Sequence, residues 1–142
     1  MDETNETVVS PEDYEALAAF RRALRRFLAF SEAAAGAEGI PPQQHQALLA
    51  IKGHPGGEPI GIGALAEALA IRHNTAVELS DRMATAGLLV RDPAPDDRRR
   101  IQLRLTPKAE AVLARLSAAH LAELRETTPL LMGLLRRFQP PG

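Results

Sequence analysis

Residues 62–106 read IGALAEALAIRHNTAVELSDRMATAGLLVRDPAPDDRRRIQLRLT, and this stretch decides the fold. Apolar side chains recur in its first eight residues at helical spacing, at Ile62, Leu65, Ala66 and Leu69. This spacing predicts a short helix with one buried face, and Gly61 directly before it can act as the N-cap. The pattern breaks at residues 71–73, so we expect a tight connection to a second helix there.

The second helix is predicted to begin near Asn74 and to end at Gly87, a residue suited to the left-handed conformation that closes many helices. Its buried stripe is expected to contain Ala76, Leu79, Met83 and Ala86. The residues near its start that face away from the core are predicted to be His73, Asn74, Thr75, Val77 and Glu78. Polar side chains of these types can hydrogen-bond to base edges in the DNA major groove. An ordinary exposed helix face is the alternative, and the helix alone does not decide between the two.

A β-hairpin is predicted after the second helix. Residues 88–90 form its first strand, which ends at Arg91, and the apolar–polar alternation over 101–105 predicts its second strand. The connecting loop, residues 92–100, contains two prolines and ends with Arg98, Arg99 and Arg100. Basic side chains at the tip of an extended loop can reach phosphates or enter the minor groove. A merely solvated loop is the alternative, but a helix-turn-helix directly before the loop favours contact with DNA. Residues 59–61 are then predicted to supply a third short strand to this sheet.

This part of the chain resembles the MarR-type transcriptional regulators. The matching segments, in order, are Asp81-Arg82, Gly87-Leu88-Leu89 with Arg91, Asp97-Arg98-Arg99, and Leu105-Thr106-Pro107-Lys108. The resemblance covers about residues 11–138 and implies a mainly α winged helix-turn-helix fold with a small β wing and flanking dimerisation helices. It implies that the second helix faces the major groove, that Arg99 is the wing-tip residue in the minor groove, and that Asp97 positions it. Arg72 stands where the family often has serine, and Glu78 where a basic residue is frequent.

Composition restricts the class of protein. The 142 residues suit one domain, and a hydrophobic content of 45% is enough for a buried core. The chain has no cysteine, no glycine-rich phosphate loop and no H-E-x-x-H motif, so we expect neither an enzyme, nor a cofactor, nor a metal site. Without a signal peptide or a long apolar run, a cytoplasmic protein with no membrane association is expected.

The net charge of −1 is unusual for a DNA-binding protein. Charge is unevenly spread, however, because residues 1–19 contain six acidic and no basic residues while residues 98–104 contain four arginines and no acid. The local field at a contact surface governs the attraction to DNA, so the total charge does not exclude binding. A winged helix that binds protein in place of DNA is the alternative function that this charge allows.

Two long segments flank the winged-helix lobe, which is predicted over residues 41–105. Residues 1–10 are expected to be a flexible acidic terminus, and Ser10-Pro11 to begin a helix over 11–37. Its seam contains Leu17, Phe20, Leu24 and Phe27, and beside the seam lie Arg21, Arg22, Arg25 and Arg26, which pair with acids or, alternatively, contact DNA.

The C-terminal segment, residues 107–138, is predicted to be helical from Thr106-Pro107, with a break at Pro129 and a new cap at Thr128. Its end is too apolar to stand in water. Segments 11–37 and 107–138 are therefore predicted to be dimerisation helices that pack against a second copy of the chain. An intramolecular core is the alternative.

The resemblance also implies a small-molecule effector, bound between the dimer helices and the lobe. Helix spacing offers Phe27, Phe30, His45 and Leu49 as candidates, and plain core residues are the alternative reading. The predicted function is a homodimeric, sequence-specific regulator, a repressor, that binds a palindromic site in double-stranded DNA and is released by a small molecule.

Overall fold

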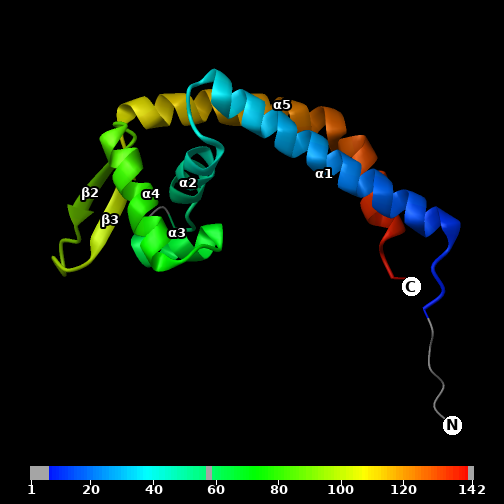
Figure 1. Cartoon of the computed structure of the whole chain (residues 1–142), viewed down its shortest axis with the longest axis horizontal. Coiled ribbons are helices and arrows are strands. Elements are labelled where there is room, and N and C mark those ends of the chain that lie inside the picture. The colour runs from blue at the N-terminus through cyan, green and yellow to red at the C-terminus, as the bar shows by residue number, and fades with distance from the viewer. Residues whose placement is uncertain (1–6, 57–58, 141–142) are drawn as a thin grey trace, which may run out of the picture. The chain divides into compact units, whose positions relative to one another are not determined.

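The computed structural model describes residues 7–56 and 59–140 (Figure 1). The described elements, in chain order, are α1 (Pro11–Ala37), α2 (Pro42–Lys52), β1 (Ile60–Gly61), α3 (Ile62–Leu69), α4 (His73–Thr85), β2 (Leu89–Pro93), β3 (Ile101–Leu105) and α5 (Pro107–Arg137). The predicted fold class, mainly helical with a small β wing, is confirmed. Most of the terminus predicted to be flexible, residues 1–6, lies outside the described residues.

The described chain forms two compact units. One unit contains the residues up to Ser31 together with those from His120 onward, and the other contains residues 32–119. Helices α1 and α5 each cross the boundary between the units. None of the helices within 7–56 and 59–140 is long and apolar enough to cross a membrane.

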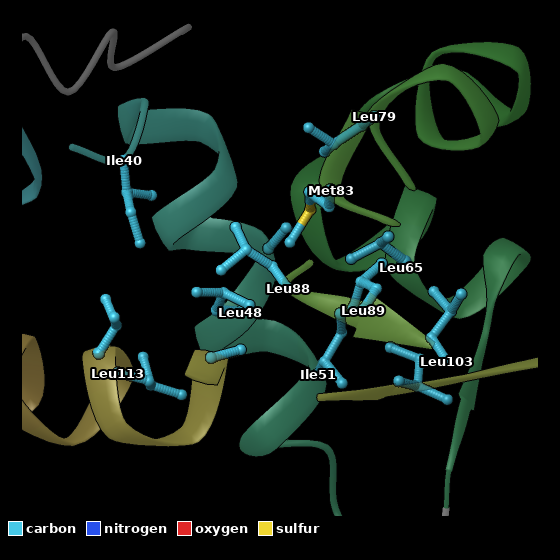
Figure 2. Close-up of a cluster of buried hydrophobic side chains, with 14 of the residues drawn as sticks. Ile40, Leu48, Ile51, Leu65, Leu79, Met83, Leu88, Leu89, Leu103 and Leu113 are labelled. Atoms are coloured by element: carbon cyan, nitrogen blue, oxygen red, sulfur yellow. The ribbon is translucent and has the colours of Figure 1, made fainter. Parts of the chain in front are cut away.

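In the unit of residues 32–119, α2, α3 and α4 surround a common core with the sheet and the start of α5. Figure 2 shows Leu48, Leu65, Met83, Leu103 and Leu113 gathered from these five elements. The side chains of Leu48, Leu65, Met83 and Leu103 are almost completely buried. Burial of a side chain of this size contributes about 1.5–3 kcal/mol, so these elements stabilise one another.

The buried side of α4 differs from the prediction at two residues. Ala76, Leu79 and Met83 are buried as expected, but Ala86 is exposed and Ser80 is buried. Ala86 is exposed because it lies beyond the last turn of the helix, where the backbone changes direction. Ser80 can be buried because its hydroxyl donates to the Val77 carbonyl oxygen at 2.8 Å, so no polar group is left without a partner.

The sheet is antiparallel, with strand order β1-β3-β2, and it confirms the short third strand predicted before α3. Strand β2 begins at Leu89, one residue later than predicted, and continues past Arg91 to Pro93, which pairs with Ile101. Proline is tolerated there because β2 is an edge strand, so its missing N–H would have faced solvent. Asp92 and Pro93, which were predicted to belong to the loop of residues 92–100, are therefore part of the sheet.

Helices α3 and α4 end in the same motif. Gly87, with φ of +76°, follows α4, and the Leu88 N–H donates to the Met83 carbonyl oxygen at 2.9 Å. Ala70, with φ of +53°, follows α3, and the Ile71 N–H donates to the Ala66 carbonyl oxygen at 3.0 Å. Both are Schellman endings, which require a left-handed residue. Among the described residues, Ala70 is the only non-glycine residue in that conformation.

In the other unit, α1 and α5 run antiparallel and contact each other. The rings of Phe20 and Phe138 meet edge to face with centroids 5.7 Å apart, and Phe27 meets His120 in the same way at 5.8 Å. Ala16 and Ala23 are buried on the same side of α1. The predicted seam is therefore divided, because Leu17 and Leu24 remain 48% and 43% exposed within one chain.

The predicted break at Pro129 is wrong, because α5 continues through this residue to Arg137. Proline removes one backbone hydrogen bond from a helix. Two threonines directly before Pro129 also form side-chain hydrogen bonds to carbonyl oxygens one turn earlier. Thr127 Oγ1 donates to the Glu123 carbonyl oxygen at 2.9 Å, and Thr128 Oγ1 donates to that of Leu124 at 2.6 Å. Thr128 therefore does not cap a new helix but bonds back within the existing one.

Candidate nucleic-acid interface

The outward face of α4 is polar and accessible. Successive residues of a helix are about 100° apart, so the side opposite buried Leu79 and Met83 is centred on Asn74, Glu78 and Asp81. His73, Asn74 and Glu78 are exposed, while Thr75 and Val77 lie half-buried on the flanks of this face. All five residues predicted to read DNA are thus at least partly accessible.

Helix α4 is fixed more firmly at its end than at its start. Arg72 is the N-cap in extended conformation, and its side chain makes no capping hydrogen bond. At the other end, Thr106 Oγ1 donates to the Gly87 carbonyl oxygen at 2.6 Å, and Lys108 Nζ donates to that of Ala86 at 3.1 Å. Thr106 also accepts a hydrogen bond from the Ala109 N–H at 3.2 Å, which caps α5. The Thr-Pro-Lys sequence therefore joins the end of α4 to the beginning of α5.

The loop after β2 is folded around Asp97. The Asp97 carboxylate accepts hydrogen bonds from the backbone N–H of Arg99 at 3.0 Å and from Arg99 Nε at 3.4 Å. At the base of the loop, the Ala94 N–H donates to the Arg100 carbonyl oxygen at 2.8 Å, and Ala94 is buried. The Arg99 side chain is 94% exposed, so this turn presents its guanidinium to solvent.

The three consecutive arginines differ in their partners. Arg100 Nη2 lies 2.6 Å from Asp96 Oδ1, and this hydrogen bond holds the pKa of the Asp96 carboxyl below its ordinary value. Arg98 is exposed and forms no ion pair with any residue in the described part of the chain. Arg98 is therefore the arginine of the loop without an acidic partner among the described residues, while Arg99 meets Asp97 through Nε and leaves the rest of its guanidinium exposed.

A cavity of about 560 Å³ lies between α4 and the wing. His73, Val77 and Ser80 line it from α4, and Arg91, Arg99 and Arg100 line it from the wing. The cavity thus brings His73 and Val77 of the predicted helix residues together with Arg99 and Arg100 of the predicted wing residues. The other predicted residues, Asn74, Thr75, Glu78, Asp97 and Arg98, do not line it. This surface combines hydrogen-bonding groups with arginines, which suits an anionic polymer.

Sequence reasoning gave no site role to three further arginines near this surface. Arg91 forms an ion pair with Asp81, which connects β2 to α4. Arg72 and Arg82 are exposed at the start of α4 and on its flank, and neither forms an ion pair within the described residues. Both Asp81 and Arg91 are among the residues that match the family, but the sequence did not predict that these two side chains, ten residues apart, form an ion pair.

The four candidate ligand residues fall into different units. Phe27 and Phe30 both meet the His120 ring edge to face, and His120 Nε2 lies 2.8 Å from Ser31 Oγ. His45 and Leu49 are on α2 in the other unit, where His45 is buried and Leu49 is 52% exposed. None of the four lines the cavity beside α4. No group of histidine and acidic side chains suited to a metal ion occurs among the described residues.

Comparison with known proteins agrees with this geometry. A model described as MarR family matches residues 38–100. A protein of Thauera aromatica, whose name describes a transcriptional regulatory protein for the hcr operon, is 31% identical over 128 residues, which cover 83% of this chain and 74% of that protein. The transcriptional repressor CouR, solved bound to a 23-mer DNA duplex, is 27% identical with a TM-score of 0.64, over 84% of this chain and 88% of that chain.

The MarR family transcriptional regulator AbsC from Streptomyces coelicolor has a TM-score of 0.70 over 87% of this chain and 83% of that chain. At 18% identity, this likeness shows a shared fold alone. The relative from Thauera aromatica and the matching family model together settle the family. The chain belongs to the MarR family of winged helix-turn-helix proteins, which are transcriptional regulators and not enzymes.

Proposed function

We propose that this protein binds double-stranded DNA with sequence specificity, with α4 in the major groove and the wing in the adjacent minor groove. The observation that carries this proposal is the shared surface of the exposed start of α4 and the solvent-directed Arg99. A phosphate strand separates the two grooves, so it would pass between α4 and the wing. The cavity at that place is lined by Arg91, Arg99 and Arg100, which suits phosphate groups.

Each predicted site residue receives a role under this proposal. Asn74 and Glu78 would reach deepest toward the bases, because they lie opposite the buried side of α4. The flanking residues His73, Thr75 and Val77 would contact the groove walls. Arg99 would enter the minor groove, held by Asp97, while Arg98 and Arg100 would contact phosphates.

A wing variant tests the DNA proposal. Selection of bound genomic fragments would first define the operator. Arg99→Ala is then expected to weaken operator binding by about 1–3 kcal/mol and to lower the salt dependence by about one unit of slope per wing. Arg125→Ala, which removes the same charge from an exposed site on α5, is the matched control and should change neither. Equal affinity of Arg99→Ala and the unchanged protein at every salt concentration would refute the wing assignment.

Absence of any binding to total genomic DNA at low salt would refute the DNA proposal itself. That outcome would favour the alternative function, a winged helix that binds another protein.

We further propose that the functional form is a homodimer. The unit formed by the ends of the chain exposes many large apolar side chains: Tyr14, Leu17, Leu24, Leu28, Leu121, Leu130, Met132, Leu135 and Phe138. Such a surface is unfavourable in water and typical of an obligate interface. A twofold dimer presents two recognition helices, so the operator would be a palindrome with half-sites about 34 Å apart.

Sedimentation velocity tests the dimer. Leu24→Glu places a charge on the apolar side of α1 and is expected to shift the protein toward the monomer. Ala29→Glu adds the same charge at an exposed residue on a different side of α1 and should leave the dimer intact. A monomer at micromolar concentration for the unchanged protein would contradict the proposal.

We also propose that the protein is a repressor whose operator complex is released by a small molecule. Support comes from family membership and, for the ligand chemistry, from the rings of Phe27, Phe30 and His120, which would suit a planar aromatic compound. A ligand can shift the dimer only if it binds one geometry more tightly than the other. A library of aromatic acids, screened by thermal shift and by operator release, tests this. If none of the compounds that raise Tm also weakens operator binding, the proposed release by a ligand is refuted. If binding of the protein to its operator does not reduce transcription in vitro, the proposed repressor role is refuted.

A further inference from the structure

We infer that Glu78 selects a cytosine in each operator half-site, beside an adenine that Asn74 reads. This inference rests on the proposed function, since it requires α4 to enter the major groove. It assigns a base preference to an acidic residue that would otherwise weaken binding to a polyanion.

The placement of the two side chains supports a joint role. Asn74 and Glu78 are four residues apart, so they lie on nearly the same side of α4 and are separated by one helical turn, about 6 Å. Both side chains are exposed. Base pairs are about 3.4 Å apart along DNA, so the two residues would reach bases within two steps of each other.

The charge of Glu78 has no partner in the described chain. Asp81, the other acid of α4, is engaged by Arg91. Arg82 stands one turn after Glu78, at a spacing that can support an ion pair on a helix, yet the structure contains no ion pair between these two residues. Glu78 is therefore the carboxylate of α4 that is available to a ligand.

The chemistry of a carboxylate determines which base it can accept. An ionised glutamate accepts hydrogen bonds and donates none. In the major groove, guanine presents acceptors only, and thymine presents an acceptor and a methyl group, so both would leave Glu78 facing unfavourable groups. Adenine presents its N6 amino donor beside the N7 acceptor, so a glutamate there would also face an acceptor. Cytosine presents the N4 amino donor alone, which a glutamate accepts. The amide of Asn74 can both donate and accept, which matches N7 and N6 of adenine.

Selection of bound DNA from a random library, with the full-length protein and its variants, tests the inference. The unchanged protein should enrich one cytosine per half-site. Glu78→Gln should replace this preference with adenine, because glutamine pairs with N6 and N7 of adenine. Discrimination against other bases at this site, roughly 5- to 150-fold in the unchanged protein, should be lost in Glu78→Ala. Preferences elsewhere in the half-site should persist.

Two controls separate the possible outcomes. Glu126→Gln makes the same charge change at an exposed residue of α5 and should leave the selected sequence unaltered. If Glu78 serves only to stabilise the helix, Glu78→Ala will lower Tm and retain every base preference, which would overturn the inference. If both Glu78 variants still select the same cytosine in a defined operator, the inference is also overturned, while the proposed function stands. Failure of the unchanged protein to bind DNA would instead remove the proposed function.

Discussion

Replacement of Gly87 by alanine is expected to destabilise the protein through its backbone alone. Gly87 has φ of +76°, and a Cβ atom added there meets no atom within 4 Å. A left-handed conformation costs a residue with a side chain about 1–2 kcal/mol. Alanine also restricts the unfolded chain, which returns about 0.4–1 kcal/mol. The net loss in free energy of unfolding should therefore be about 1 kcal/mol.

The reverse substitution at Ala70 provides the matching test. Ala70 occupies the equivalent position after α3, with φ of +53°. Ala70→Gly removes the same conformational penalty and should stabilise the protein by up to about 1 kcal/mol. Two substitutions of opposite chemistry at equivalent helix ends are thus expected to act in opposite directions.

Urea unfolding measures both effects as shifts of the transition midpoint. All variants must be compared at one protein concentration, because the stability of a dimer depends on concentration. Gly133→Ala in the interior of α5 is the control, since a Cβ there also meets no atom within 4 Å but the backbone is helical. It should stabilise by about 0.5–1 kcal/mol. A neutral or stabilising Gly87→Ala, or a destabilising Ala70→Gly, would refute the assignment of the cost to backbone conformation.

Three further predictions concern polar contacts of the helix ends and the wing. The backbone N–H of Ser10 and, to a smaller extent, its hydroxyl hold the pKa of Asp13 below its ordinary value, so Ser10→Ala should raise this pKa only part of the way, as an NMR titration would show. A lowered carboxyl pKa stabilises the fold above the unfolded-state pKa, and this effect is lost as pH falls through the folded-state pKa. The variant should therefore lose more stability at neutral pH than in strong acid, where only the loss of the bond from the Asp13 N–H to the Ser10 hydroxyl remains. Thr106→Val removes the cap of α5 and the bond to Gly87, so urea unfolding should show a loss of about 1–2 kcal/mol. Asp81→Asn removes an exposed ion pair with Arg91 and should change stability by less than about 1 kcal/mol, and a larger loss would show that this contact holds β2 against α4.

The sequence predicted most of the winged-helix lobe because its signals are local. Each of these signals depends only on residues that are close in sequence. They are the helical spacing of residues 62–69, the alternation of residues 101–105 and the glycine at position 87. The two errors in the helices have a different origin. Ala86 continues the spacing of α4 but follows the residue where the helix stops. Helix α5 continues through Pro129, which removes only the one hydrogen bond that its own N–H would have donated.

The candidate site was predicted less completely than the fold. Residue types predicted the helix face and the arginine loop without distinguishing Arg98, Arg99 and Arg100, and only the family resemblance singled out Arg99 and its neighbour Asp97. The structure separates them, because Asp96 engages Arg100 and the turn at Asp97 directs Arg99 outward. Similarly, the contact of Asp81 with Arg91 depends on the angle between a helix and a strand. Such pairings follow from tertiary geometry, which a charge pattern does not encode.

The bonds from Thr106 and Lys108 to the carbonyl oxygens of Gly87 and Ala86, the two residues after α4, have a mechanical consequence. Helix α5 starts at this junction and continues without interruption to Arg137, into the unit that exposes the apolar side chains. Because α5 is bonded at its start to the residues that end α4, a rotation of the first turns of α5 would be transmitted to α4. Under the proposed function, a change at the start of α5 would therefore alter the surface that faces DNA without any molecule contacting α4.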